Sequence, residues 1–252
     1  MPKIAFITGA SAGIGAATAS ILAQNGYNLL LAARRLDRLE TLATELQAQY
    51  GVRVHTFALD VRNRAEVSAQ LNALPAEWQN IDVLVNNAGL SQGLDAFHEA
   101  NLDDWDTMID TNVKGLLYVS RSVSEWMVAR KTGHIINIGS IAGKETYANG
   151  NVYCATKHAV DSLNKAMRID LLPHAIRVTG IHPGAVETEF SAVRFKGDIE
   201  RAKKVYDGFD PLVAQDIAEA IWFAVSRPAH VTINDLVIMP TAQANTSHLL
   251  KK

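Results

Sequence analysis

The sequence predicts one α/β domain over residues 1–252: a doubly wound, seven-stranded parallel sheet with helices on both faces. Short β-rich runs alternate with longer amphipathic runs, which is the pattern of βαβ units. The strand-like runs are apolar throughout and do not alternate with polar residues, as expected when both faces of a sheet are covered. No linker-like stretch and no repeat of fixed period divides the chain.

The first half of the chain contains four predicted strands, at residues 4–8, 29–33, 52–59 and 81–85. Helices are predicted at residues 16–24, 37–50 and 64–74. In the second of these, Leu39, Leu42 and Leu46 share one face, and Gly51 is a typical helix stop. Pro75 ends the third.

The second half continues the alternation. A long helix is predicted over residues 105–131, with a break at Gly115, followed by a strand at 135–138, a helix at 152–172 and a strand at 176–181 that ends at Pro183-Gly184. The polar residues 187–210 interrupt the pattern, and we expect them to form an insertion that covers the substrate at one end of the sheet. A helix at 215–226 and a strand at 236–239 complete the domain.

Composition excludes several classes of protein. Lys and Arg number 24 against 26 Asp and Glu, giving a net charge of −2, so neither nucleic acid nor a membrane surface is an expected partner. One cysteine rules out a disulfide framework within the chain and favours a reducing compartment. No apolar run approaches the ~20 residues of a membrane span. The histidines show no metal-ligand spacing, so no metal site is expected. We therefore expect a soluble, cytoplasmic protein.

A glycine-rich turn, TGASAGIG at residues 8–15, joins the first strand to the first helix. Glycines permit a tight turn and close approach of the backbone to a pyrophosphate, and the following helix offers free N–H groups. The spacing is G-x-x-x-G-x-G, and the alternative is an ordinary strand–helix turn. The strand and helix on either side favour a dinucleotide site, with the expected contacts Gly9, Ser11, Gly13, Ile14 and Gly15.

Arg34 and Arg35 follow the second strand, at the place where an acidic residue would hold the ribose diol of NAD. A guanidinium binds a 2′-phosphate that a carboxylate would repel. The sequence therefore predicts NADP(H) as cofactor. Spacing does not decide which arginine makes the contact, and the alternative is that both begin a solvated helix.

Polar and glycine-rich loops also follow the third and fourth strands. We expect Asp60 to accept a hydrogen bond from the adenine amino group and Asn86 to position the adenosine ribose. Loop capping is an equally good explanation of both residues. The predicted cofactor contacts in these loops are Asp60, Val61, Asn86, Ala88 and Gly89.

Ser140 ends the fifth strand, and Tyr153 and Lys157 lie four residues apart on the next helix, so they share a face. An unperturbed tyrosine has a pKa near ~10, and a nearby ammonium group lowers that value by favouring the phenolate. Ser140 is expected to donate a hydrogen bond to the substrate oxygen. Asn112 is expected to hold a water that links Lys157 to solvent; the alternative is a polar helix residue without such a role.

Taken together, these motifs resemble the short-chain dehydrogenase/reductase family, over essentially the whole chain. The matching pieces are TGASAGIG, NNAG at 86–89, Asn112, Ser140, YCATK at 153–157 and Pro183-Gly184. The resemblance implies a Rossmann fold with Tyr153 as general acid/base, Ser140 orienting the carbonyl, Lys157 binding the nicotinamide ribose and Asn112 completing a proton relay. It also implies contacts to the nicotinamide from Pro183, Gly184, Val186 and Thr188, and a homotetramer with the helices 105–131 and 152–172 at one interface.

Four segments resemble the NADP-dependent 3-hydroxy acid dehydrogenase branch of that family: PAEWQNIDVLVNNAGL, TGHIINIGSIAG, TEFSAVRFKGD and NDLVIMPTAQA. The resemblance implies oxidation of L-allo-threonine, serine and 3-hydroxyisobutyrate, and reduction of malonic semialdehyde to 3-hydroxypropionate. The alternatives are a reductase of sulfoacetaldehyde or of broad carbonyl substrates, and a regulator that binds NADP without chemistry. An acidic substrate requires a cation, for which Lys144, Arg194 and Lys196 are candidates; the alternative is that all three are solvated or interface charges.

Overall fold

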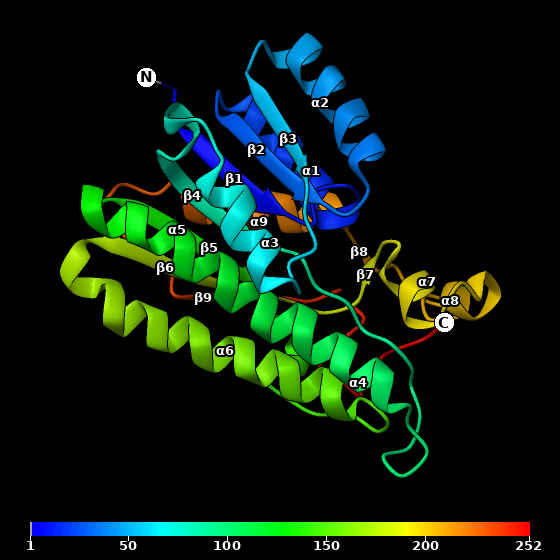
Figure 1. Ribbon diagram of the computed structural model, residues 1–252. Helices are drawn as coiled ribbons and strands as arrows, with labels where there is room; N and C mark the ends of the chain where they lie inside the picture. The colour runs from blue at the N-terminus through cyan, green and yellow to red at the C-terminus, as the bar shows by residue number, and fades with distance from the viewer. Residues whose placement is uncertain (1) are drawn as a thin grey trace.

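The computed structural model describes residues 2–252 and contains the predicted seven-stranded sheet (Figure 1). All neighbouring strands are parallel, in the order β3-β2-β1-β4-β5-β6-β9. The order reverses between β1 and β4, and in such sheets ligands bind beyond the carboxyl ends of the strands at that reversal. The strands span β1 (Ile4–Thr8), β2 (Asn28–Ala33), β3 (Val54–Ala58), β4 (Ile81–Asn86), β5 (Gly133–Ile138), β6 (Ile176–Pro183) and β9 (Asp235–Ile238).

Helices cover both faces of the sheet, as predicted. Side chains of α1 (Gly13–Gln24), α2 (Leu36–Tyr50) and α9 (Ala214–Val225) pack in one apolar core with Ala5 and Ile7 of β1. Those of α3 (Arg64–Asn72), α5 (Leu116–Arg130) and α6 (Asn151–Leu171) pack in a second core with Phe6. Successive strand residues point to opposite faces, which explains why β1 is buried along its whole length.

The long predicted helix at 105–131 contains a change of helix type instead of a break. It consists of α4 (Leu102–Ile109), a π-helical segment (Asp110–Gly115) and α5 in direct succession. Gly115 is helical, and a Cβ there would lie 2.6 Å from Cγ2 of Val61. The glycine therefore permits close packing against the loop after β3 and does not end the helix.

Residues 187–210 form two short helices at the carboxyl end of the sheet, α7 (Phe190–Arg194) and α8 (Ile199–Lys204) (Figure 1). They lie between β7 (Val186–Glu187) and β8 (Leu212–Val213), a two-residue parallel pair that the sequence did not predict. Within residues 2–252, no helix is both long and apolar enough to cross a membrane.

Candidate active site

A cavity lies at the carboxyl ends of the strands, between the end of β2 and the start of α7. Most of the predicted site residues line it, although Gly9 and Thr188 are 179 residues apart in the sequence. The predicted residues that line the cavity are Gly9, Ser11, Gly13, Ile14, Arg34, Arg35, Asp60, Val61, Ala88, Gly89, Ser140, Tyr153, Lys157, Pro183, Gly184, Val186 and Thr188.

The glycine turn has the geometry of a phosphate cradle. Gly9 has φ +65°, and a Cβ on it would lie 2.9 Å from the Cα of Ala88. Gly15 lies beneath the turn, where a Cβ would collide with the carbonyl of Gly9. The helix α1 begins at Gly13, and Ala12 offers no side-chain cap to its first N–H groups. Free N–H groups and the positive end of the helix dipole at an open turn suit the pyrophosphate of a dinucleotide.

The two arginines after β2 have different surroundings. No hydrogen bond or ion pair joins the side chain of Arg34 to another residue within 2–252. Arg35 donates through Nε and Nη2 to Oγ of Ser11, at 3.3 and 3.2 Å, and through Nη1 to Oε2 of Glu189 at 2.8 Å. Arg38 pairs with the other oxygen of Glu189 at 2.6 Å. Three guanidinium groups therefore gather at the adenosine side of the cavity.

Of the polar residues predicted after β3 and β4, Asp60 lies in the cavity wall and Asn86 lies in the interior of the protein. Asp60 lines the cavity, and its hydrogen bonds to Arg62 lower the pKa of the carboxyl group. Asn86, in contrast, is buried and lies outside the cavity lining. Its Nδ2 donates to Oγ of Ser120 and to Oδ1 of Asn137, at 2.8 and 2.9 Å. The side chain of Asn86 braces β4 against β5 and α5, so the expected ribose contact through this side chain is corrected.

Ser140, Tyr153 and Lys157 meet at the middle of the cavity. Ser140 follows β5 and lines the cavity together with Tyr153, and its Oγ accepts a hydrogen bond from the N–H of Ala142 at 3.0 Å. Tyr153 and Lys157 lie one turn apart on α6, and Nζ of Lys157 is 5.9 Å from the centre of the tyrosine ring. The Lys157 ammonium donates to the carbonyl oxygen of Ile138 at 3.0 Å, which fixes it at the end of β5. The predicted trio is thus brought together by one strand end and one helix face.

Burial dominates the electrostatics of this trio. It raises the pKa of Tyr153, while the positive charge of Arg194 and the hydrogen bond to Ser140 oppose that rise. Burial also lowers the pKa of Lys157 to about 8. The pKa of Tyr153 is therefore raised overall, and Arg194 is the nearby cation that opposes this rise. The expected lowering of the tyrosine pKa by Lys157 stays a prediction.

Asn112 lies in the π-helical segment, outside the cavity lining, and its side chain is fully engaged. Oδ1 accepts from the N–H of Leu90, and Nδ2 donates to the carbonyl of Leu90 and to Oγ1 of Thr156, all within 3.0 Å. A Cβ on Gly89 would lie 3.2 Å from Oδ1 of Asn112 and 3.6 Å from Nζ of Lys157. Asn112 therefore lies next to the predicted relay, while its side chain ties together three segments of the cavity wall.

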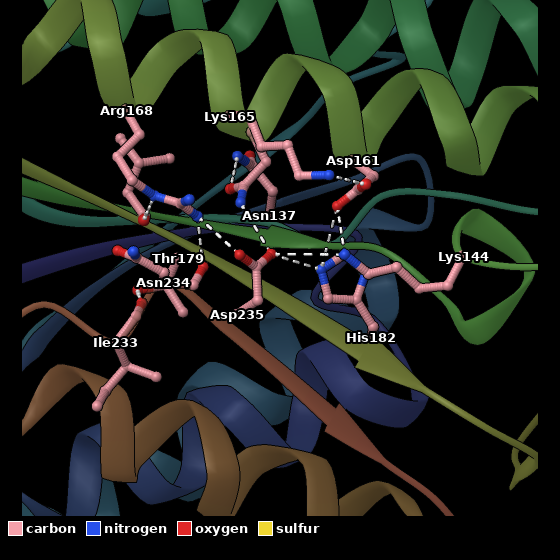
Figure 2. A network of polar contacts seen from close by, with 12 residues as sticks. Asn137, Lys144, Asp161, Lys165, Arg168, Thr179, His182, Ile233, Asn234 and Asp235 are labelled. Carbon is pink, nitrogen blue, oxygen red and sulfur yellow. Dashed lines mark hydrogen bonds and ion pairs between the residues drawn. The ribbon is translucent and has the colours of Figure 1, made fainter.

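Lys144 was predicted as a ligand for the acid group of the substrate, and its placement corrects that prediction. Its Nζ lies 2.6 Å from Oδ1 of Asp161 and 3.8 Å from Oδ1 of Asp235, among the charged groups shown in Figure 2. Nε2 of His182 lies 3.0 Å from the same oxygen of Asp235. Asp161, His182 and Asp235 have the atoms of a metal site, but the ammonium group of Lys144 supplies the positive charge beside them. The charge of Lys144 is paired within this cluster, and Lys144 does not line the cavity.

Arg194, the other predicted cation, is also absent from the cavity lining, but it packs against Tyr153 and Phe190, which do line the cavity. Its guanidinium carbon is 5.3 Å from the ring centre of Tyr153 and 5.1 Å from that of Phe190. Nη2 donates to the hydroxyl of Tyr147 at 3.2 Å, and the buried Nε has no hydrogen-bond partner within residues 2–252. Lys196, two residues beyond the end of α7, instead pairs with Asp104 of α4 at 2.9 Å.

No sequence pattern pointed to Tyr147, Arg38 or Glu189 as residues of the site. Tyr147 holds Arg194 from a loop 47 residues away, and Glu189 meets Arg35 and Arg38 across 154 and 151 residues. Each of these three residues belongs to an unremarkable polar stretch. No local pattern marks such residues, because their partners become neighbours only when the insertion folds onto the end of the sheet.

Comparison with known proteins agrees with this geometry. Residues 3–198 match the family model described as short chain dehydrogenase. The chain is 50% identical over 242 residues to the NADP-dependent 3-hydroxy acid dehydrogenase YdfG of Salmonella typhi, covering 96% of each chain. It is 43% identical over 251 residues to the NADP-dependent 3-hydroxy acid dehydrogenase of Schizosaccharomyces pombe, covering 99% of this chain and 97% of the relative.

Among solved structures, the chain is similar to the closed form of serine dehydrogenase complexed with NADP⁺, with a TM-score of 0.92, 47% identity and 99% coverage of both chains. The cofactor predicted from Arg34 and Arg35 is the one named for these relatives. With its cavity, its Ser-Tyr-Lys trio and its matching family model, the chain belongs to the short-chain dehydrogenase family.

Proposed function

We propose that the protein transfers a hydride between NADP and C3 of small 3-hydroxy acids. The observation that carries this proposal is the placement of Arg194, whose guanidinium lies against the ring of Tyr153 with one buried N–H unpaired. A planar guanidinium binds a carboxylate through two parallel hydrogen bonds. A substrate held there by its acid group presents its hydroxyl carbons next to the catalytic phenol.

The chain's own residues supply orientation and proton transfer. When bound, NADP supplies the hydride acceptor of the oxidation. Ser140 donates a hydrogen bond to the substrate oxygen, and the phenolate of Tyr153 takes the hydroxyl proton at Oη. The positive charge of Arg194 favours this phenolate, and the ammonium group of Lys157 lies 5.9 Å from the centre of the same ring. Residues 187–210 cover the substrate, because α7 carries both Phe190 and Arg194.

An absorbance assay of nicotinamide reduction tests the proposal. NADP and NAD are supplied separately with L-serine, L-allo-threonine and 3-hydroxypropionate. We expect NADP-dependent oxidation that a Tyr153→Phe variant loses, because phenylalanine has no proton-accepting group. A preference for NAD would overturn the assignment of the arginines after β2. Activity that survives in the variant would refute the role of the tyrosine.

The Arg194→Ala variant is expected to raise KM for a 3-hydroxy acid by roughly tenfold to a hundredfold, since a charge-assisted pair is worth about 1.5–3 kcal/mol. KM for a neutral carbonyl compound should change much less. Arg201→Ala is the matched control, because Arg201 also stacks on an aromatic ring of the insertion, 4.4 Å from the centre of Phe195, and is exposed. Equal changes for acidic and neutral substrates would refute the carboxylate site.

A reductase of sulfoacetaldehyde or of broad carbonyl compounds remains the second candidate, because a sulfonate is also an anion that Arg194 can bind. The two functions separate on a panel of carboxylate, sulfonate and neutral substrates. The highest kcat/KM on the carboxylates is the result expected here, and the highest value on the sulfonate would favour the second candidate.

A further inference from the structure

The carboxylate of Glu189 joins two guanidinium groups on the adenosine side of the cavity. Oε2 lies 2.8 Å from Nη1 of Arg35, and Oε1 lies 2.6 Å from Nη1 of Arg38. The three side chains are between 43% and 48% exposed. These pairs hold the pKa of the Glu189 carboxyl below its usual value, so the group is ionised near neutral pH.

The same arginine also reaches the glycine turn. Arg35 donates to Oγ of Ser11 from the side opposite Glu189, so hydrogen bonds run from the phosphate cradle through Arg35 to the insertion. Ser11, Arg35 and Glu189 all line the cavity. A cofactor that lies along this cavity must therefore pass these contacts when it enters or leaves.

Glu189 occupies a decisive place in the insertion, directly before α7. Its carbonyl accepts from the N–H of Val193 and so belongs to the first turn of that helix. The helix ends at Arg194, the residue that faces Tyr153. Fixing Glu189 to the body of the protein therefore fixes the adenosine-side end of the element that covers the substrate.

The ion pairs leave charge for a 2′-phosphate. Three positive charges, on Arg34, Arg35 and Arg38, face the one negative charge of Glu189. Arg34 lines the cavity and has no hydrogen-bond or ion-pair partner within residues 2–252. A phosphate can thus pair with Arg34 while Glu189 keeps Arg35 and Arg38. The arrangement permits a bound cofactor while the insertion stays attached through Glu189.

We propose that Glu189, Arg35 and Arg38 form a strap that ties the insertion to the body of the protein and slows release of the cofactor, for NADPH and NADH alike. The proposal rests on the proposed function only in requiring that the cofactor binds in this cavity. Glu189 and Arg38 are positioning residues, since they act through the insertion.

The insertion has a second, separate attachment on the substrate side. Lys196 pairs with Asp104 of α4, and the carbonyl of Arg194 accepts from the N–H of Gly93 at 3.0 Å. Cutting the strap at Glu189 therefore loosens the adenosine side while the substrate side stays attached. This predicts faster cofactor release with little change in KM for the substrate.

The test measures cofactor binding and release by the whole protein, from the fluorescence of NADPH and NADH. Glu189→Gln keeps the shape of the side chain and removes its charge. We expect the dissociation rate of NADPH to rise about fivefold, as for the loss of two half-exposed ion pairs, and the Kd of NADH to rise by a similar factor. Glu187→Gln is the matched control: this neighbouring exposed carboxylate has no ion pair within residues 2–252, and its loss should change neither value.

A double-mutant cycle tests the pairing itself. Arg38→Ala removes one of the two ion pairs that Glu189→Gln removes, so it should accelerate NADPH release less than Glu189→Gln does. The double variant should be no faster than Glu189→Gln alone, because Glu189→Gln already removes the contact with Arg38. Additive effects would overturn the strap, as would an unchanged release rate in Glu189→Gln.

One further outcome would reverse the inference. Slower NADPH release from Glu189→Gln, with NADH unchanged, would mean that Glu189 competes with the 2′-phosphate for the arginines. A wild-type protein that binds neither cofactor would refute the proposed function instead, so the two failures are distinguishable.

Discussion

At the scale of single residues, the burial of Lys157 in the catalytic trio lowers the stability of the fold. The side chain is buried, and its ammonium group makes one hydrogen bond, to the carbonyl of Ile138. Burial disfavours its charged form and lowers its pKa from 10.5 to about 8. At neutral pH the folded protein therefore carries a charge that the unfolded chain holds more favourably.

We expect Lys157→Met to abolish activity yet stabilise the fold at pH 7. The lowered pKa corresponds to a penalty on the order of 3 kcal/mol, reduced by the hydrogen bond that the variant loses. Between the folded pKa of about 8 and the unfolded value of 10.5, the unfolded chain binds a proton that the folded chain has lost. Wild-type stability should rise with pH across that interval, so the advantage of the variant should disappear by about pH 10.5.

Urea unfolding at pH 7, 8.5 and 10 measures this difference. Lys165→Met, on the same helix, is the control. Lys165 is exposed and paired with Asp161, which raises its pKa, so its removal should give no such gain. A stability difference for Lys157→Met that does not vary with pH would contradict the assignment.

The surroundings of the predicted cations Lys144 and Arg194 could not be predicted from the sequence. Lys144 follows the strand that ends at Ser140, Arg194 lies in the polar insertion, and both carry the charge that an acidic substrate requires. The structure pairs Lys144 with Asp161, 17 residues later on α6, and leaves Arg194 against Tyr153. The sequence marked both residues as candidate cations, but the pairing of one of them with a carboxylate depends on contacts across the fold that no local pattern encodes.

At the scale of elements, the π-helical segment between α4 and α5 is held from its inner side by Asn112. Its amide makes three hydrogen bonds, two to the backbone of Leu90 in the loop after β4 and one to Thr156 on α6. Single-turn π segments are rare and are found mostly at functional sites. Here the segment places a polar side chain next to Gly89 and Lys157.

Asn112→Ala should therefore lower stability by roughly 2 to 4 kcal/mol, because it leaves buried backbone groups of Leu90 unpaired. Activity should fall as well, since Leu90 follows directly on Gly89 in the cavity wall. Asn72→Ala is the control: Asn72 makes one exposed hydrogen bond, to Ser68 on α3. Thermal unfolding and kcat would be measured for both. Wild-type stability in Asn112→Ala would show that the amide does not hold the three segments together.

Elements were also the scale at which the sequence was most informative. Every strand of the main sheet and every long helix was predicted, because apolar runs and glycine or proline stops are local signals. The pair β7–β8 was not, since two residues carry no period and its partners lie 26 residues apart. The π-helical segment was predicted only as a break, because Gly115 suggests weakness unless the close approach of Val61 is known.

At the scale of the whole molecule, several exposed apolar side chains lie on the helices α4, α5 and α6. Leu102 and Leu117 lie on α4 and α5, and Ile169 and Leu172 lie at the end of α6, with exposed fractions from 37% to 74%. The long helices α5 and α6 run along the outside of the fold on the same side of the sheet (Figure 1). The sequence resemblance implies an interface of the homotetramer on these two helices, and an apolar surface is what such an interface buries.

We therefore expect the protein to behave in solution as a tetramer, four times 27.4 kDa or about 110 kDa. The double variant Ile169→Glu, Leu172→Glu should shift it to a smaller species, because association would then bury two unpaired carboxylates in each protomer. Leu36→Glu on α2, across the sheet, should leave the assembly intact. Light scattering after size exclusion measures all three. A wild-type mass of 27.4 kDa would refute the tetramer, and a double variant that stays tetrameric would place the interface elsewhere on the surface.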